Sequence, residues 1–123
     1  MDRFAFEDLN AYKHARALVR SVYVLIKKLP REEQFALGDQ LRRAVVSVPS
    51  NIAEGVSRIS DKEKAHFLEI SYGSLMETLC QLTLAYDLGY ISQDELEQEK
   101  IHISDTAKLL SGLRSHYTQN TTH

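Results

Sequence analysis

The sequence contains one cysteine, no tryptophan and two prolines, and no apolar run approaches the ~18 residues that a membrane span needs. A lone Cys80 cannot form an internal disulfide. With no Cys or His at ligand spacing, Cys80 is expected to be a small core residue rather than a nucleophile. The segment Met1–Phe4 lacks the basic and apolar regions of a signal peptide. We therefore expect a cytoplasmic protein with no membrane association.

The 123 residues are 43% hydrophobic and 26% charged, which is typical of one globular domain over residues 1–123. The net charge is -2, but it is unevenly distributed. Residues 1–62 hold 11 Lys/Arg and 8 Asp/Glu, whereas residues 63–123 hold 4 and 9. Three interpretations stay open: an uneven solvated surface, a basic face that meets an acidic face of the next copy in a head-to-tail oligomer, or a basic half that contacts nucleic acid.

Four helices are predicted, at about 8–29, 33–59, 61–88 and 92–117. Pro30 ends the first helix, because the residue before a proline is pushed away from helical geometry. Ser60–Glu63 and Ser92–Glu95 have the spacing of capping boxes and open the third and fourth helices. Gly89 is the expected C-terminal stop of the third.

Apolar residues recur at three- and four-residue steps, and in the fourth helix at seven-residue steps. The predicted core positions are Ala15, Leu18, Val22, Leu25, Ile26 and Leu29, then Leu37, Leu41, Val45, Val48, Ile52, Val56 and Ile59, then Phe67, Ile70, Leu75, Leu79, Leu82 and Tyr86, and finally Leu96, Ile103, Leu110 and Tyr117. Short connections force neighbouring helices to run antiparallel. The fold class is therefore all-α, an antiparallel up-down-up-down four-helix bundle.

A series of polar residues lies beside the apolar stripe of the second helix: Gln40, Arg43, Ser47, Ser50, Asn51, Glu54 and Arg58. A matching series follows the third helix: Ser71, Gly73, Ser74, Glu77, Thr78 and Gln81. Two interpretations are possible. Each series is a solvent-exposed side of its helix, or the two series face each other and form a polar seam between the helices. Serine and asparagine are weak helix formers, which favours the seam.

The second and third helices are antiparallel and are joined near residue 60. Residues equally far from this connection, one on each helix, therefore lie at the same height along the bundle, and their residue numbers sum to about 120. This predicts an ion pair between Arg43 and Glu77 and a small-residue contact between Ser47 and Gly73.

Pro49 lies inside the second helical pattern, where a proline removes a hydrogen bond and collides with the carbonyl four residues back. One interpretation is two separate helices, with the break at the proline. One kinked helix is favoured, because Val45, Val48, Ile52 and Val56 stay in phase across it. Serine hydroxyls or water are expected to satisfy the carbonyl of Val45.

Several motifs together resemble the bacterial four-helix-bundle proteins encoded in 23S rRNA intervening sequences. They are Phe6-Glu7-Asp8-Leu9, Arg42-Arg43-Ala44, Val48-Pro49-Ser50-Asn51-Ile52-Ala53-Glu54-Gly55 with Arg58, Phe67-Leu68-Glu69-Ile70, Gly73-Ser74 with Glu77, and Leu88-Gly89-Tyr90. The accessory protein of diversity-generating retroelements resembles the same family. The resemblance implies a pentameric barrel of bundles with no known catalytic activity. For the retroelement branch it implies binding to a reverse transcriptase and to nucleic acid.

Two Glu-x-x-His motifs, Glu63–His66 and Glu99–His102, are of the kind used by di-iron bundles. The expected helix ends place them roughly 18 Å apart along the bundle axis, too far for one shared centre. The sequence has no Gly-x-Ser-x-Gly motif and no phosphate-binding glycine loop. We predict no catalytic residue, cofactor, metal or small-molecule substrate.

The sequence supports two hypotheses of function. The first is a non-enzymatic oligomeric scaffold or adaptor, in which the polar seam of Arg43, Ser47, Asn51, Glu54, Arg58, Gly73, Ser74 and Glu77 sets the packing of helices. The alternative is an RNA- or DNA-binding module, accessory to a reverse transcriptase in one branch of the family. Its candidate phosphate contacts are Lys13, Arg16, Arg20, Lys27, Lys28, Arg31 and Arg42, the basic strip.

Overall fold

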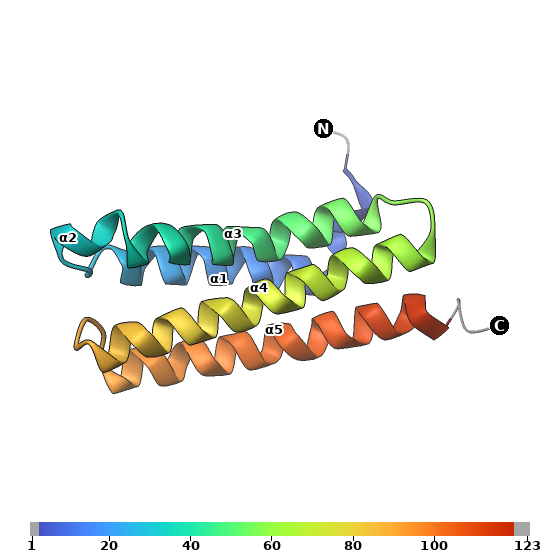
Figure 1. Ribbon diagram of the computed structural model, residues 1–123. Helices are drawn as coiled ribbons and strands as arrows, with labels where there is room; N and C mark the ends of the chain where they lie inside the picture. Colours follow the sequence, from blue (N-terminus) through green and yellow to red (C-terminus); the bar gives the residue numbers. More distant parts are fainter. Residues whose placement is uncertain (1–2, 120–123) are drawn as a thin grey trace.

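The computed structural model describes residues 3–119, and within that range it contains helices and no strands. The elements are a short 3-10 helix η1 (Ala5–Asp8) and the helices α1 (Asn10–Ile26), α2 (Arg31–Gln34), α3 (Leu37–Val56), α4 (Asp61–Asp87) and α5 (Gln93–Gln119). The four long helices lie side by side and alternate in direction (Figure 1). The predicted four-helix bundle is confirmed.

The order of the helices around the bundle decides which surfaces each one exposes. Helix α1 packs against α3 and α5, and α4 packs against the same two helices. Helices α1 and α4 are therefore diagonal to each other, and their outward surfaces face opposite sides of the bundle. This arrangement matters for the surfaces described below.

Two predicted helix boundaries are wrong. The predicted helix 8–29 is the 3-10 turn η1 followed by α1, which ends at Ile26, four residues before Pro30. The predicted helix 33–59 is interrupted at Ala36, whose φ of -112° and ψ of -95° are not helical. Gln34 accounts for the break, because its side-chain amide donates to the carbonyls of Ile26 and Leu29 at the end of α1. The amide thereby ties α2 to the exit of the preceding helix.

The predicted start and stop signals of the last two helices are confirmed. The Ser60 hydroxyl accepts the amide of Glu63, and Ser92 and Glu95 satisfy each other's amides in a complete capping box. Gly89 has a φ of +81°, a left-handed conformation that favours glycine. It ends α4 as predicted.

The core follows the predicted stripes in α1, in α3 from Leu41 to Ile52 and in the first three positions of α5, whereas in α4 only Leu75 and Leu82 of the predicted positions are fully buried. Its fully buried members include Leu18, Val22, Leu41, Val45, Val48, Ile52, Leu68, Leu75, Leu82, Ile103 and Leu110. Ile70 and Tyr86, predicted as core, are exposed, and so is Cys80. Ile59 is 97% exposed because α3 ends at Val56. The inward positions of α4 that the sequence did not predict include Leu68 and the small residues Ser71, Thr78 and Ala85.

Gly55 of α3 lies in tight contact with Phe67 of α4. A Cβ atom built on Gly55 would lie 2.7 Å from the Cβ of Phe67, a distance that real side chains do not adopt. The Cβ atom of Phe67 is attached directly to the backbone, so rotation of the side chain cannot relieve such a contact. Any larger residue at position 55 must therefore push the two helices apart.

We expect Gly55→Ala to destabilise the fold by about 1–3 kcal/mol, although alanine is the better helix former. Gly112→Ala in α5 is the matched control, because no atom lies within 4 Å of its added Cβ. The control should gain up to about 1 kcal/mol. Urea unfolding of both variants measures the difference, and equal stability changes would contradict the close contact.

Candidate functional site

The polar series of α3 and α4 forms a hydrogen-bonded seam between the two helices. The hydroxyls of Ser47 and Ser74 lie 2.8 Å apart, and the Asn51 amide donates to both the hydroxyl and the carbonyl of Ser47 at 2.8 Å. One turn along, the buried Ser71 hydroxyl donates to the carbonyl of Val48 at 2.8 Å. The predicted height matching of the two helices therefore holds.

Pro49 lies inside a continuous α3, so the prediction of one helix rather than two is confirmed. Three side chains supply hydrogen bonds to carbonyls around the proline. Ser50 donates to Val46, Asn51 to Ser47, and Ser71 of α4 to Val48. The expected carbonyl, that of Val45, is not among their acceptors. The three donors instead bind the carbonyls of Val46, Ser47 and Val48, which follow Val45 in the chain. The bend at the proline leaves these carbonyls accessible to side chains.

Two predicted contacts of the seam are wrong. Arg43 and Glu77 are exposed and do not come within ion-pair distance of each other. Equal height is not sufficient, because both side chains point outward from the α3/α4 interface. Gly73 also faces outward with open space around it, and Ser47 contacts the next residue, Ser74, instead.

The far end of the seam is held by Arg58. Its guanidinium donates to Glu54 at 2.9 Å and lies 4.5 Å from the centre of the Phe67 ring. Packing thus explains the Asn-Ile-Ala-Glu-Gly motif. Asn51 donates a hydrogen bond within the seam and Ile52 is buried in the core. Glu54 forms an ion pair with Arg58, and Gly55 leaves space for the Phe67 side chain. These residues position helices and present no reactive group to a cavity.

We expect the hydroxyl pair to be energetically coupled and the charged pair not to be. A double-mutant cycle of Ser47→Ala and Ser74→Ala should give a coupling of about 0.5–1.5 kcal/mol. The cycle of Arg43→Ala and Glu77→Ala, at the neighbouring height of the same helices, should be additive. Thermal or urea unfolding provides both cycles, and coupling of the charged pair alone would reverse this assignment.

The structure divides the predicted basic strip. Lys13, Arg16, Arg20 and Lys27 are exposed along or directly after α1, and Arg31 is exposed on α2. Two residues do not belong to a free basic surface. Lys28 is ion-paired with Glu95 of α5, and this lysine lowers the pKa of the Glu95 carboxyl. Arg42 is bonded within the fold.

Arg42 has a structural role that sequence reasoning missed. Its guanidinium donates to the carbonyl and side-chain oxygen of Gln34, both at 2.8 Å, and to Asp39 at 3.0 Å. Gln34 in turn bonds the end of α1. Arg42 therefore fixes α2 between α1 and α3, and no local pattern in the sequence indicates this.

The two Glu-x-x-His motifs serve different structural purposes. Glu63 lies in the first turn of α4, whereas Glu99 is only 7% exposed and faces α1 from α5. Within residues 3–119 no three His, Cys, Asp or Glu side chains gather in a way that would hold a metal ion. The Ser21 hydroxyl donates to the Glu99 carboxylate at 2.8 Å, and His102 Nδ1 lies 3.9 Å from it.

Burial raises the pKa of the Glu99 carboxyl, and the hydrogen bond from Ser21 opposes this only in part. Because the pKa in the folded protein lies above that of the unfolded chain, ionisation of Glu99 opposes folding. This cost is absent in acid below the unfolded pKa and is fully present above the folded pKa.

Glu99→Gln should therefore stabilise the protein at pH 7 while keeping an acceptor for Ser21. The advantage over the wild type should disappear near pH ~3, below the unfolded pKa, where the carboxyl is protonated in both states. Glu97→Gln is the control, since Glu97 is exposed on the same helix. Melting temperatures between these pH values measure the effect, and a parallel pH profile for all three proteins would contradict it.

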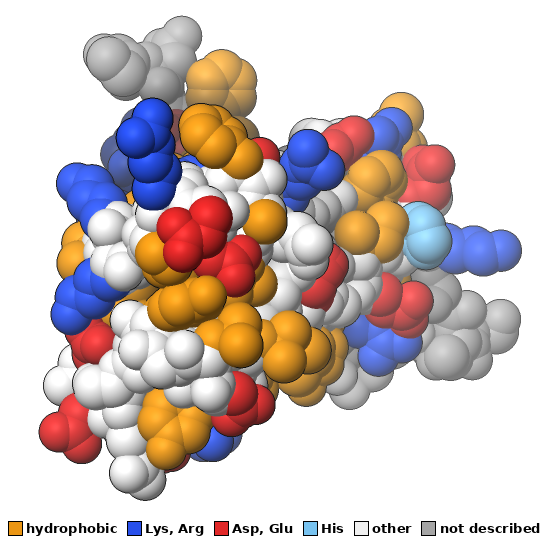
Figure 2. All heavy atoms as spheres, turned by 60° about the vertical axis from the view of Figure 1, so that its left-hand side comes forward, with side chains coloured by type: hydrophobic (Ala, Val, Ile, Leu, Met, Phe, Trp, Pro, Cys, Tyr) orange, Lys and Arg blue, Asp and Glu red, His pale blue; other side chains and the backbone are white. Residues whose placement is uncertain are grey.

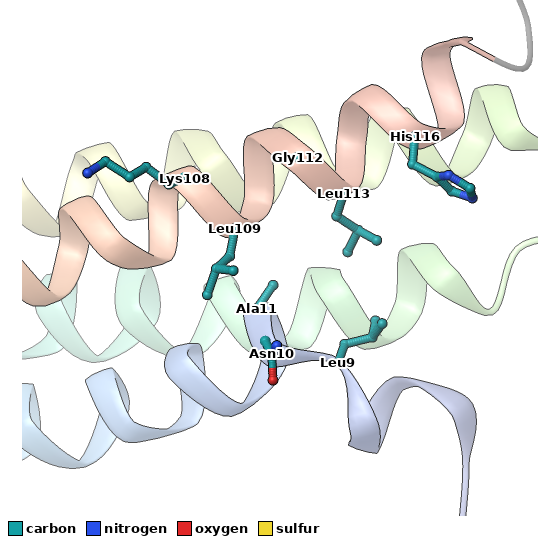
Figure 3. A pocket seen from close by; sticks show the side chains of 8 residues that line it. All are labelled: Leu9, Asn10, Ala11, Lys108, Leu109, Gly112, Leu113 and His116. Atoms are coloured by element: carbon teal, nitrogen blue, oxygen red, sulfur yellow. The ribbon is translucent and has the colours of Figure 1, made fainter.

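A shallow hollow lies between the start of α1 and the end of α5. It has a volume of about 360 Å³, and Leu109 and Leu113 point across it toward Ala11 and Leu9 (Figure 3). Its remaining lining residues are Asn10, Lys108, Gly112 and His116. The lining is mostly apolar, and Lys108 points away from it. No acidic side chain is among its lining residues.

The family model described as 23S rRNA-intervening sequence protein matches residues 7–112. The chain belongs to this family. A crystal structure of another protein has the same fold, with a TM-score of 0.78 and 22% sequence identity over 85% of this chain and 97% of that one. It is a protein with unknown function from the S23 ribosomal protein family of Bacteroides thetaiotaomicron VPI-5482. The comparison with curated proteins finds no match.

The match to the 23S rRNA-intervening sequence family covers α1, α3, α4 and most of α5, including the whole seam. The family resemblance inferred from the sequence motifs is confirmed. Within residues 3–119 no helix of this family member combines the length and apolar composition that crossing a bilayer requires.

Sequence reasoning missed the outward surface of α4. Ile70, Gly73, Glu77, Cys80, Leu84 and Leu88 are all exposed, and we call them the outer stripe of α4. Their three- and four-residue spacing is visible in the sequence. The spacing does not reveal the surface by itself, because it also fits a buried Ile70 and a buried Cys80.

Proposed function

We propose that this protein is a non-enzymatic scaffold that binds macromolecules, including copies of itself, through the outer surfaces of its helices. One observation carries the proposal: α4 is apolar on both sides. Its inward positions Leu68, Leu75 and Leu82 are fully buried. On the opposite side, Leu84 and Leu88 are 46% and 58% exposed.

A helix with apolar residues on both faces is normally covered on both. Hydrophobic side chains also gather on the end of the bundle seen in Figure 2, with charged side chains around them. Apolar centres with a polar rim are characteristic of interaction surfaces. A closed ring, such as the pentamer implied by the family resemblance, is one assembly that would cover the outer stripe of α4.

Light scattering coupled to gel filtration tests the proposal at micromolar concentration. We expect a mass above the 14.0 kDa of one chain. Leu84→Glu should lower the mass, because it places a charge in the outer stripe of α4. Ile101→Glu is the matched control on α5, where the isoleucine is exposed outside this stripe and the substitution should leave the mass unchanged. A monomeric wild type would refute self-association.

Nucleic-acid binding is the second candidate, and one observation favours it. Helix α1 contains no acidic residue, and Lys13, Arg16 and Arg20 on it are exposed. Phosphate groups are recognised by such a surface, and the affinity falls as salt rises. Titration of single-stranded and duplex RNA and DNA at ~50 mM salt distinguishes this candidate from a pure protein scaffold, since absence of binding there would exclude it.

A further inference from the structure

Helix α1 has an outward stripe of its own. Lys13, Arg16, Arg20, Tyr23 and Lys27 recur at alternating steps of three and four and are all exposed, and we call them the outer stripe of α1. None of its cations forms an ion pair within residues 3–119. The stripe is therefore a basic surface that contains an aromatic residue and has no ion-paired counter-charge in the described part of the chain.

The outer stripe of α4 is complementary in both charge and polarity. From residue 65 to its end, α4 contains no Lys or Arg but three acidic residues, Glu69, Glu77 and Asp87. Glu69 is bound by Arg114 of α5. Glu77 and Asp87 have no ion-pair partner among the described residues. The stripe and the neighbouring exposed Asp87 thus offer apolar contact area with two carboxylates that have no ion-pair partner among the described residues.

We propose that the outer stripe of α1 in one copy packs against the outer stripe of α4 in the next copy. This inference rests on the self-association proposed above and names the two surfaces that make it. The aliphatic stems of Arg16 and Arg20 would cover apolar surface beside Leu84, while their guanidinium groups reach Glu77. Tyr23 adds an amphipathic ring of the kind that is enriched at interfaces.

The diagonal placement of α1 and α4 gives this contact a direction. The two stripes face opposite sides of one molecule, so they cannot meet within it. Each added copy presents a free α1 stripe on one side and a free α4 stripe on the other. Such a heterologous contact produces a ring or a chain of copies rather than a symmetric pair.

A second copy is favoured over a polyanion as the occupant of the α1 stripe. Nucleic acid would neutralise the basic residues but would leave the apolar and acidic surface of α4 exposed. A second copy satisfies both stripes at once, in equal number, because every chain carries one of each. The charge complementarity lies between two surfaces of the same molecule.

Charge reversal on each stripe, followed by mixing, tests the inference. The α1 variant carries Arg16→Glu and Arg20→Glu, and the α4 variant carries Glu77→Arg and Asp87→Arg. Each alone should have a lower mass than the wild type by light scattering, because like charges meet across the contact. An equimolar mixture should regain a mass above one chain, because the reversed α1 stripe of one variant then faces the reversed α4 stripe of the other, and native faces native at the second contact.

Lys100→Glu with Lys108→Glu is the charge-matched control, because both lysines are exposed on α5 outside the two stripes. This control should assemble as the wild type does, and circular dichroism should show all variants equally helical. A wild type that assembles while the α1 variant also assembles, or while the mixture gains no mass, overturns this inference alone. A monomeric wild type overturns the proposed self-association itself.

Discussion

The close approach of α3 and α4 at the polar seam is the constraint on which the rest of the bundle depends. Ser47 and Ser74 join the helices in the middle, and Gly55 lets Phe67 fit against α3 near its end. Hydroxyls and a glycine at these points allow a short distance between backbones that larger side chains would prevent. Once the two helices are fixed in this register, the positions of α1 and α5 on either side follow from burial of their apolar stripes.

The seam also makes Pro49 compatible with a continuous helix. A proline in a helix interior removes one backbone hydrogen bond and exposes nearby carbonyls. Here Ser50, Asn51 and Ser71 donate to three of those carbonyls, and one of these donors comes from α4. The polar residues that looked unusual for a bundle helix therefore support both the bend and the interhelical contact. Their spacing around the proline gives the motif a structural explanation.

Much of the fold was predictable, because apolar periodicity, capping boxes and Gly89 are local signals. The register of α3 and α4 also followed from their short connection. The seam's actual partners did not. Arg43 and Glu77 are level but point outward, whereas Ser47 pairs with Ser74 rather than Gly73. The break at Ala36 was equally hidden, because it depends on Gln34 and Arg42 bonding residues from three different elements. Side-chain direction and contacts between elements cannot be obtained from spacing alone.

The sequence by itself determined the helical class, the number of long helices, the continuity of α3 through Pro49 and the family. These follow from backbone preferences and from periodic burial, which act over a few residues. Tertiary structure alone decided which residues complete the inward side of α4. Both sides of that helix are apolar, so its own pattern is ambiguous, and only packing against α3 and α5 places Leu68 inside and Ile70 outside. The same packing sets α1 diagonal to α4 and so separates the basic surface from the apolar, acidic one.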